Sequence, residues 1–454
     1  MRGKIKEWVS KEFETLKMKS ARLERRFKMV MSDLSDQPDK SVWLASGSRA
    51  NAKAVYRMIA NPKCTKESIL TAYREAVKIR NEEAILLSIQ DTMCVSYEGH
   101  TKTEGLGYSS EKTLGINSHN CVLFTPVGVP IGLMEQRVST RLEGKSEKSD
   151  HEKRSRPIEE KESYRWLETM KTAAANAPEG VTLIHIADRE GDIYELYALA
   201  EQTGERFVIR ATHNRRSTED TLIMDELSES AVAGKVKVVI PENHKTKAKE
   251  RETVLSVRYK SFDVKKPHFL NREKKLPPSL TLNLISVTEE NAPEGAEPIE
   301  WLLMTNLELD TVEDAIQVVD YYRQRWKIER FHFVLKSGCE IEKIQQRSVD
   351  AIELVLLMYS IIAIHIMMLT YTARTAPDTP CSLIFSDDEW KTLYRAATLT
   401  REAPSEPYSI ADAVRFVAKL GGFVGSPSDG PPGLKVIWLG LNALFILNAY
   451  REWI

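Results

Sequence analysis

The sequence predicts a mixed α/β protein with helical segments at both ends. Between residues 84 and 305, short apolar runs with the composition of β-strands alternate with amphipathic stretches, which is typical of an α/β sheet. Before and after this region, apolar residues recur at the spacing of α-helices. The 454 residues are 42% hydrophobic and 28% charged, which supplies enough apolar material for buried cores, and the length alone suggests about three domains.

Residues 1–60 are predicted to form three helices. Apolar residues recur every three to five positions over 5–16, and a second helix is expected over 22–31. A third helix begins after Ser48, whose hydroxyl suits a helix N-cap, and ends before the Asn-Pro pair at 61–62. The N-terminal segment therefore has the pattern of a small helical domain.

Basic side chains on these helices form a candidate DNA-binding surface. Arg22 and Arg26 lie on the second helix, and Arg49, Lys53 and Arg57 follow one another at four-residue spacing on the third. Small helices with a basic stripe suit a DNA groove. A single stripe of this kind could equally be a solvated surface, but three basic helices in one segment favour DNA.

The net charge of −1 conceals an uneven distribution. Residues 1–60 carry 14 basic and 7 acidic groups, and residues 241–280 carry 11 and 5. Local charges of +7 and +6 within a total of −1 leave −14 for the rest of the chain. The total excludes a uniformly basic protein, but it does not exclude an enzyme that binds DNA through two basic segments.

The central region is predicted to contain strands, two helices and an all-β insertion. A hairpin is expected between 120 and 138, because Gly128-Val129-Pro130 separates two strand-like runs. Helices are expected over 160–175 and 193–201. The other strand-like runs are 84–90, 181–187, 206–211, 236–240, 253–259, 280–287 and 301–305.

The C-terminal third is predicted to be helical. A long helix is expected over 311–336, and an apolar helix over 354–369. At 16 residues, with His365 among them, the latter is short for a membrane span, which needs about 20 residues, so we expect a helix buried in a core and no membrane partner. Residues 374–408 resemble an irregular linker, and two helices, 411–420 and 434–454, close the chain.

The five cysteines are widely scattered, and no segment resembles a secretory signal. No Cys-x-x-Cys or Cys/His cluster predicts a zinc site, so a reducing compartment is the simplest interpretation. We therefore expect a cytoplasmic protein.

Two aspartates are candidate catalytic residues. Asp91 and Asp188 each end an apolar strand-like run, and active sites of α/β sheets usually lie at the carboxyl ends of strands. One such aspartate is more often a cap or turn residue. Clustered carboxylates, however, bind Mg²⁺, and two such ions can activate the attacking oxygen and stabilise the leaving oxygen in phosphoryl transfer.

A third carboxylate lies in the long helix predicted over 311–336. On an ideal helix Tyr322, Arg325, Glu329 and Lys336 share an arc of about 60°. The carboxylate suits a metal ion, and the phenol, guanidinium and ammonium groups suit phosphate oxygens. An exposed face with an Arg325–Glu329 ion pair is the alternative that geometry alone leaves open.

The spacing Y-x2-R-x3-E-x6-K of these four residues resembles the signature of bacterial DDE transposases of the insertion-sequence-four family, and specifically its Tn5-like branch. Asp91 within IQDTMCVSY and Asp188 within DREGDIY are similar to the family's other catalytic runs. RFVIRATH from Arg206, PIEWLLMT around Trp301 and AKLGGF at 418–423 follow in the same order. The resemblance spans nearly the whole chain.

The resemblance implies an RNase H-like catalytic core. It implies a helical domain for recognition of the DNA end over 1–70, a catalytic domain over 71–372 with a β insertion at about 212–300, and a helical dimerisation region over 373–454. Asp91, Asp188 and Glu329 would bind two Mg²⁺ ions, for which Mn²⁺ would substitute. In the family, nicking frees a 3′-hydroxyl, which forms a hairpin that is opened before the end joins target DNA.

Carried over by motif, Tyr322, Arg325 and Lys336 would hold the terminal phosphates and the extruded base, Trp301 would stack on that base, and Arg210 would contact the DNA backbone. Some positions depart from the family pattern. Phe333 stands where relatives often have a basic residue, and Leu-Gly at 114–115 replaces a more usual Arg-Gly. Arg49 and Lys53 differ in charge from relatives, which implies a different end sequence.

Two functions remain open. The first is an active cut-and-paste transposase that binds double-stranded DNA at transposon ends and in the target, and that works as a homodimer in the synaptic complex. The second is a catalytically silent DNA-binding or dimerising inhibitor of transposition. The three carboxylates and the basic N-terminus favour the first, because inhibitors in this family lack that N-terminus.

Overall fold

The computed structural model describes residues 5–100, 102–141, 156–240, 251–270, 273, 275–293, 298–426 and 430–450. The chain forms two compact units, which we describe separately. Unit 1 comprises 1–83, 92–146 and 327–454, and unit 2 comprises 84–91 and 147–326. Residues 241–250 of the second basic segment and 451–454 of the predicted last helix lie outside the described residues.

Unit 2 is built on a sheet that is parallel at one end and antiparallel at the other. The first part of β1 (Ile85–Ser96) pairs in parallel with β5 (Thr182–Ala187), and β5 pairs in parallel with β6 (Arg206–Arg210). The remaining neighbours are antiparallel and follow in the order β10 (Glu300–Thr305), β9 (Ser279–Glu289), β8 (Arg251–Lys265) and β7 (Gly234–Ile240). The predicted β insertion thus extends the sheet, and it also contains one helix, α9 (Ile223–Glu229).

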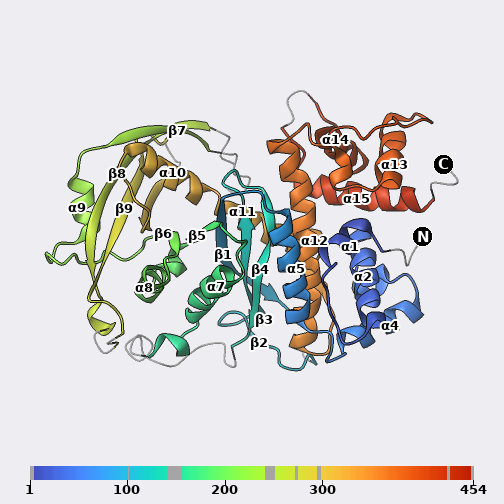
Figure 1. Ribbon diagram of the computed structural model, residues 1–454, viewed down its shortest axis with the longest axis horizontal. Helices are drawn as coiled ribbons and strands as arrows, with labels where there is room; N and C mark the ends of the chain where they lie inside the picture. The colour runs from blue at the N-terminus through green and yellow to red at the C-terminus, as the bar shows by residue number, and fades with distance from the viewer. Residues whose placement is uncertain are drawn as a thin grey trace. The chain divides into compact units, whose positions relative to one another are not determined.

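Helices cover the sheet of unit 2 (Figure 1). Those that belong to this unit are α7 (Tyr164–Ala175), α8 (Tyr194–Thr203), α9 (Ile223–Glu229) and α10 (Val312–Arg323). Large side chains of α7 and α8, among them Trp166 and Tyr197, pack with Phe207 of β6 and Leu282 of β9 in one hydrophobic cluster. The alternation of buried and exposed residues along β9 explains how one strand contributes several members to that cluster.

Unit 1 contains a smaller group of strands. The second part of β1 is the neighbour of β3 (Leu114–Phe124), which pairs antiparallel with β2 (Gly107–Tyr108) and with β4 (Pro130–Ser139). The predicted hairpin is confirmed, and Gly128 has a positive φ of 87° in its turn. Strand β1 therefore belongs to both groups of strands. Its first part, which ends at Asp91, pairs within unit 2, and its second part is the neighbour of β3.

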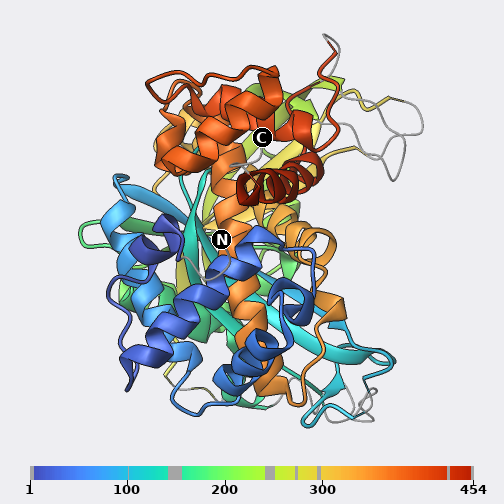
Figure 2. The ribbon, with the colours of Figure 1, turned by 90° about the vertical axis from the view of Figure 1, so that its right-hand side faces the viewer.

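The remaining elements of unit 1 are helices grouped around the long helix α12 (Val349–Thr375), as Figure 2 shows. The N-terminal ones are α1 (Glu7–Glu12), α2 (Ala21–Asp36), α3 (Val42–Ala45), α4 (Arg49–Ile59) and α5 (Lys66–Arg80). The later ones are α11 (Trp326–Phe333), α13 (Asp387–Thr398), α14 (Ile410–Leu420) and α15 (Leu434–Ala449). Helix α12 is long and apolar enough to cross a membrane, but 83% of its most apolar window is buried within the protein, as expected of a core helix.

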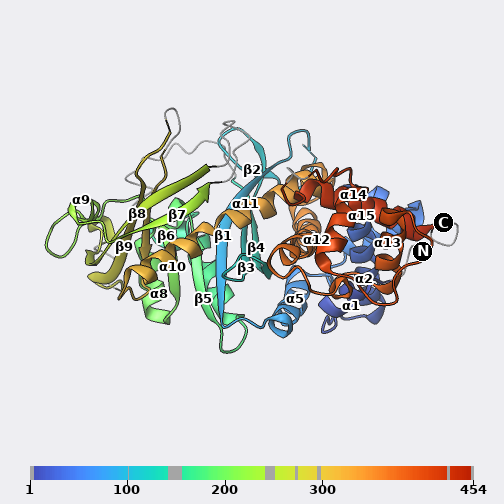
Figure 3. The same cartoon turned by 90° about the horizontal axis from the view of Figure 1, so that it is seen from above.

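Three expectations for local structure were wrong. Asp91 does not end a strand, because β1 continues to Ser96. The long helix expected over 311–336 is interrupted after Arg323, resumes as α11 and is followed by a π-helical turn at Val334–Gly338. Figure 3 labels both helices, α10 and α11. Helix α13 lies in the stretch expected to be irregular.

Candidate functional site

Two of the predicted catalytic carboxylates are neighbours on one face of the unit 2 sheet. Ile89 of β1 lies opposite Ile186 of the parallel strand β5. Two residues further in the same register, Asp91 is level with Asp188, which follows β5 in an extended conformation. Paired parallel strands are about 4.8 Å apart, and equivalent positions project to the same face. The register of the two strands, continued by two residues, thus places Asp91 and Asp188 level with each other.

The turn after β5 orients the carboxylate of Asp188. A short 3₁₀ helix, Arg189–Gly191, begins there, and Asp188 is its N-cap residue. The Oδ1 atom of Asp188 accepts a hydrogen bond of 2.9 Å from the backbone N–H of Glu190. Asp188 is half-buried, so its carboxylate has a fixed orientation and remains accessible to a ligand.

Aromatic and basic side chains from three other elements of unit 2 gather beside Asp188. The ring of Trp301 on β10 meets the ring of Tyr322 on α10 edge to face, with centroids 5.5 Å apart. Arg210 at the end of β6 donates a 3.0 Å hydrogen bond from Nη2 to the carbonyl of Glu300, which precedes Trp301. The hydroxyl of Tyr322 interacts with Arg210.

The pKa values of Tyr322 and Arg210 reflect burial and the charged groups around them. Burial raises the pKa of Tyr322, against the opposing effect of Arg325 and Arg210, and the carboxylate of Asp188 raises it further. Burial lowers the pKa of Arg210, and the positive charges of Arg189 and Arg325 lower it as well. Several positive groups held close together attract an anion of more than one charge, such as a DNA phosphate.

A buried aspartate that the sequence analysis did not single out holds the turn in place. Asp192 accepts hydrogen bonds from the Tyr197 hydroxyl at 2.6 Å and from the backbone N–H groups of Thr212 and His213 at 2.6 and 2.9 Å. The Nη1 atom of Arg215 lies 2.5 Å from its Oδ1 atom. The DREGD run contains this residue, but nothing local in the sequence separates its structural role from the catalytic role expected of Asp188.

Glu329 and Lys336 belong to unit 1. Glu329 is half-buried on α11, and Lys336 lies in the π-helical turn that follows, with its Nζ atom 3.4 Å from a carboxylate oxygen of Glu342. The break after α10 removes the single ideal helix on which the four signature residues were aligned. Within the described ranges, no group of three or more His, Cys, Asp or Glu side chains is close enough to hold a metal ion.

The basic residues predicted to bind DNA lie on the surface of the N-terminal helices. Arg49 and Lys53 are exposed on α4, whose opposite side buries Ala52 and Val55. Ser48 is the N-cap of this helix, as predicted, and its hydroxyl accepts from the backbone N–H of Asn51. On α2, Arg22 is exposed and Arg26 is half-buried.

Helix α15 has the apolar surface expected of a region that pairs with another chain. Its inner side buries Ile437, Trp438 and Leu444, whereas Leu439 is 40% exposed and Ile446 is 51% exposed. Exposed large aliphatic side chains on one helix mark a surface suited to protein contact.

The chain is similar to known transposases. The chain matches three family models in sequence order: a transposase DNA-binding model over residues 5–64, a transposase DDE domain model over 157–365 and a Tn5 transposase dimerisation domain model over 361–451. Among solved structures, the piggyBac transposase synaptic complex with hairpin DNA matches with a TM-score of 0.38 and 10% identity, over 82% of this chain and 73% of that one.

The fold and the matched domains define a DNA-transposing nuclease and strand transferase with an RNase H-like core. More particularly, the chain belongs to the DDE transposases of the Tn5 type. Membership of this family implies dependence on a divalent metal ion, a DNA partner and dimerisation.

Proposed function

We propose that the chain is a cut-and-paste transposase that cleaves transposon ends through a nick, a hairpin and its resolution, and then joins the ends to target DNA. The observation that carries this proposal is the common register of Asp91 and Asp188, beside the Tyr322, Arg210 and Trp301 cluster. Paired carboxylates next to a basic and aromatic cluster suit phosphoryl transfer on DNA.

The donor set suits divalent cations such as Mg²⁺. The carboxylate oxygens of Asp91 and Asp188 are hard ligands held on adjacent strands, and Glu329 is the third residue that we assign to metal binding. Two such ions, when bound, would supply Lewis-acid stabilisation and an activated water, with Mn²⁺ as a substitute for Mg²⁺.

The protein's own groups would bind and orient the DNA end. Arg210, Arg325 and Lys336 would hold phosphates, and the edge-to-face pair of Trp301 and Tyr322 would receive a base extruded from the duplex. Stacking on an aromatic ring compensates part of the cost of unstacking that base.

The N-terminal and C-terminal regions would supply specificity and assembly. The exposed Arg49 and Lys53 on α4, with Arg22 and Arg26 on α2, would contact the end sequence and its backbone. Leu439 and Ile446 of α15 would contribute to a homodimer in the synaptic complex.

A cleavage assay on duplex DNA that carries the element's own inverted repeats tests the proposal. Asp188→Ala should lose at least about a thousandfold in cleavage rate while it still shifts the same DNA in a gel. Glu201→Ala, which removes an exposed carboxylate from the end of α8, is the control and should cleave normally. Wild-type cleavage by Asp188→Ala would overturn the assignment. End binding without cleavage by the wild-type chain would instead indicate the silent inhibitor.

A further inference from the structure

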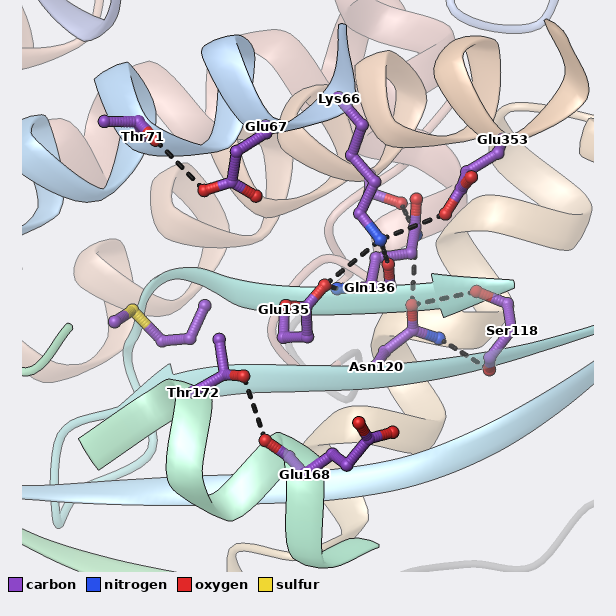
Figure 4. Close-up of polar contacts among 12 residues, drawn as sticks. Lys66, Glu67, Thr71, Ser118, Asn120, Glu135, Gln136, Glu168, Thr172 and Glu353 are labelled. Carbon is purple, nitrogen blue, oxygen red and sulfur yellow. Dashed lines mark hydrogen bonds and ion pairs between the residues drawn. The ribbon is translucent and has the colours of Figure 1, made fainter. Parts of the chain in front are cut away.

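A fully buried polar network occupies the interior of unit 1 behind α11. Ser118 and Asn120 on β3, Gln136 on β4 and Ser360 on α12 all have no exposed surface. The Nε2 atom of Gln136 donates to Asn120 Oδ1 at 3.0 Å and to Ser360 Oγ at 2.6 Å. Figure 4 shows the side chains of Ser118, Asn120 and Gln136 turned toward one another between the strands.

Asn120 is the residue through which this network reaches α11. Its Oδ1 atom accepts from Gln136 and from the hydroxyl of Ser118 at 3.0 Å, and its Nδ2 atom donates to the carbonyl of Ser118 at 3.1 Å. The same Nδ2 atom lies 3.2 Å from Nε2 of His332, which therefore acts as the acceptor. All four hydrogen-bonding positions of the Asn120 amide are thus used, which fixes its orientation.

His332 lies on α11, three residues after Glu329. Helix α11 has only eight residues, follows a break after α10 and ends in a π-helical turn. Because α11 is not the continuation of a longer regular helix, its orientation about its own axis must be set by tertiary contacts. Residues three apart are neighbours on a helix face, so the contact that fixes His332 also constrains the direction of Glu329.

At Gln136, the network is next to ion pairs that connect three elements of unit 1. The ammonium group of Lys66 on α5 lies 3.2 Å from a carboxylate oxygen of Glu135 and 3.0 Å from one of Glu353, and it donates to the carbonyl of Gln136. Arg74 donates to Glu135 at 3.2 Å. These ion pairs join α5, β4 and α12, so the network has a rigid base (Figure 4).

We propose that Asn120 and Gln136 are positioning residues that set the rotation and depth of α11, and hence the place of Glu329 in metal binding. Burying polar side chains in one core costs stability unless they are paired, and a fully paired amide such as that of Asn120 permits a single orientation. Among the described residues the Oε1 atom of Gln136 has no partner, so the Gln136 amide is held through its Nε2 atom. The inference rests on the proposed function, because it assumes that Glu329 is a metal ligand.

The test combines Mn²⁺ binding with hydrogen exchange in the full-length protein bound to end DNA. Asn120→Leu keeps the number of side-chain heavy atoms and the branching at Cγ, and it removes the hydrogen bonds of the Asn120 amide. It should weaken Mn²⁺ binding, followed by electron paramagnetic resonance, by 10- to 100-fold, which is the usual effect of removing a partner behind a metal ligand. Backbone amides of α11 should exchange faster, while affinity for the DNA end stays unchanged.

Val122→Ala is the matched control, because Val122 is fully buried on the same strand and is apolar. It should lower the thermal midpoint without weakening Mn²⁺ binding. His332→Leu approaches the same contact from the helix side and should reproduce the Mn²⁺ defect, so the test does not depend on the folding of Asn120→Leu. Equal Mn²⁺ affinity in the network variants and in Val122→Ala would overturn the inference.

A Glu329→Gln variant separates this inference from the proposed function. If Glu329→Gln loses Mn²⁺ affinity and the network variants do not, the network only stabilises the fold. If Glu329→Gln binds Mn²⁺ normally, the assignment of Glu329 as a ligand fails, and faster exchange confined to α11 in Asn120→Leu would still show that the network holds the helix.

Discussion

Removal of the Asp192 carboxylate should destabilise unit 2 more than any exposed acidic substitution. The Asp192 side chain is fully buried, and Arg215, its ion-pair partner, is 7% exposed. In Asp192→Ala the guanidinium keeps its charge without the carboxylate 2.5 Å away, and the Tyr197 hydroxyl and two backbone N–H groups lose their acceptor. Breaking one partner of a buried ion pair costs about 3–5 kcal/mol.

The magnitude can be checked against its parts. Each neutral donor left without a partner in the interior costs about 1–3 kcal/mol, but relaxation and water entry recover part of that. The costs of the three unpaired donors therefore cannot simply be added to the cost of breaking the ion pair. We expect a loss of about 3–5 kcal/mol in the free energy of unfolding.

Urea unfolding of unit 2, followed by hydrogen exchange of β5, β6 and α8, measures this loss segment by segment. Asp225→Ala is the control, because Asp225 is exposed and its 2.8 Å hydrogen bond with Asn214 lies at the surface. The double variant Asp192→Leu/Arg215→Met should recover most of the stability, since it removes the unpaired charge as well. A loss below about 1 kcal/mol for Asp192→Ala would refute the reasoning, because an unpaired buried guanidinium cannot be that cheap.

Three further predictions concern acid stability, the hairpin step and salt dependence. Burial, reinforced by Lys6, lowers the pKa of His365 to about 3, below its unfolded value of 6.5, so stability should fall as pH drops below about 6.5. The loss in the free energy of unfolding at pH 5 is at most about 2 kcal/mol, because His365 is only half-buried and lines a cavity. In His365→Phe, the free energy of unfolding should change less between pH 7 and pH 5 than in the wild-type protein. Trp301→Ala should slow hairpin formation about 10- to 100-fold but not the first nick, as single-turnover gels would show; equal slowing of both steps would contradict a stacking role. Arg49→Ala/Lys53→Ala should reduce the slope of log affinity against log salt by about 2, and an unchanged slope in fluorescence anisotropy would exclude phosphate contacts there.

The strands and aspartates of unit 2 were predictable because their signals are local. Apolar runs of strand length place β5 and β6 correctly, and the polar turn after β5 identifies Asp188. The early end assigned to the first strand was wrong, because the pattern from Asp91 onward alternates and the strand continues on another partner. The register that brings Asp91 level with Asp188 is a property of pairing and has no signal in either run alone.

The sequence contains a start signal for helix α13, but the composition of the surrounding segment favoured an irregular structure. Pro, Ser, Thr and Asp residues across 374–408 favoured an irregular segment. Ser386 and Glu389 form a capping box, with the Glu389 carboxylate accepting from the Ser386 backbone N–H at 3.0 Å. The S-x-x-E spacing alone would have located the start of this helix.

The buried network behind α11 had no such signal. Asn120, Gln136 and His332 are separated by up to 212 residues in sequence, and each alone is an ordinary polar residue without a recognisable motif. A helical spacing pattern could place Glu329 and His332 on one side of α11, but it could not indicate what lies against that side. Only the fold supplies the partner, so positioning residues are the part of a catalytic site that sequence patterns miss.

The three assigned carboxylates are held by different kinds of structure. Asp91 and Asp188 continue a hydrogen-bonded pair of strands, where a shift of either strand by one residue would turn its aspartate to the opposite face. Glu329 stands on a helix of eight residues between a break and a π-helical turn, where a small rotation costs no sheet hydrogen bonds. An active site that needs all three must therefore obtain its accuracy at Glu329 from side-chain contacts. Variation at Asn120, Gln136 and His332 should consequently alter metal dependence before it alters the fold.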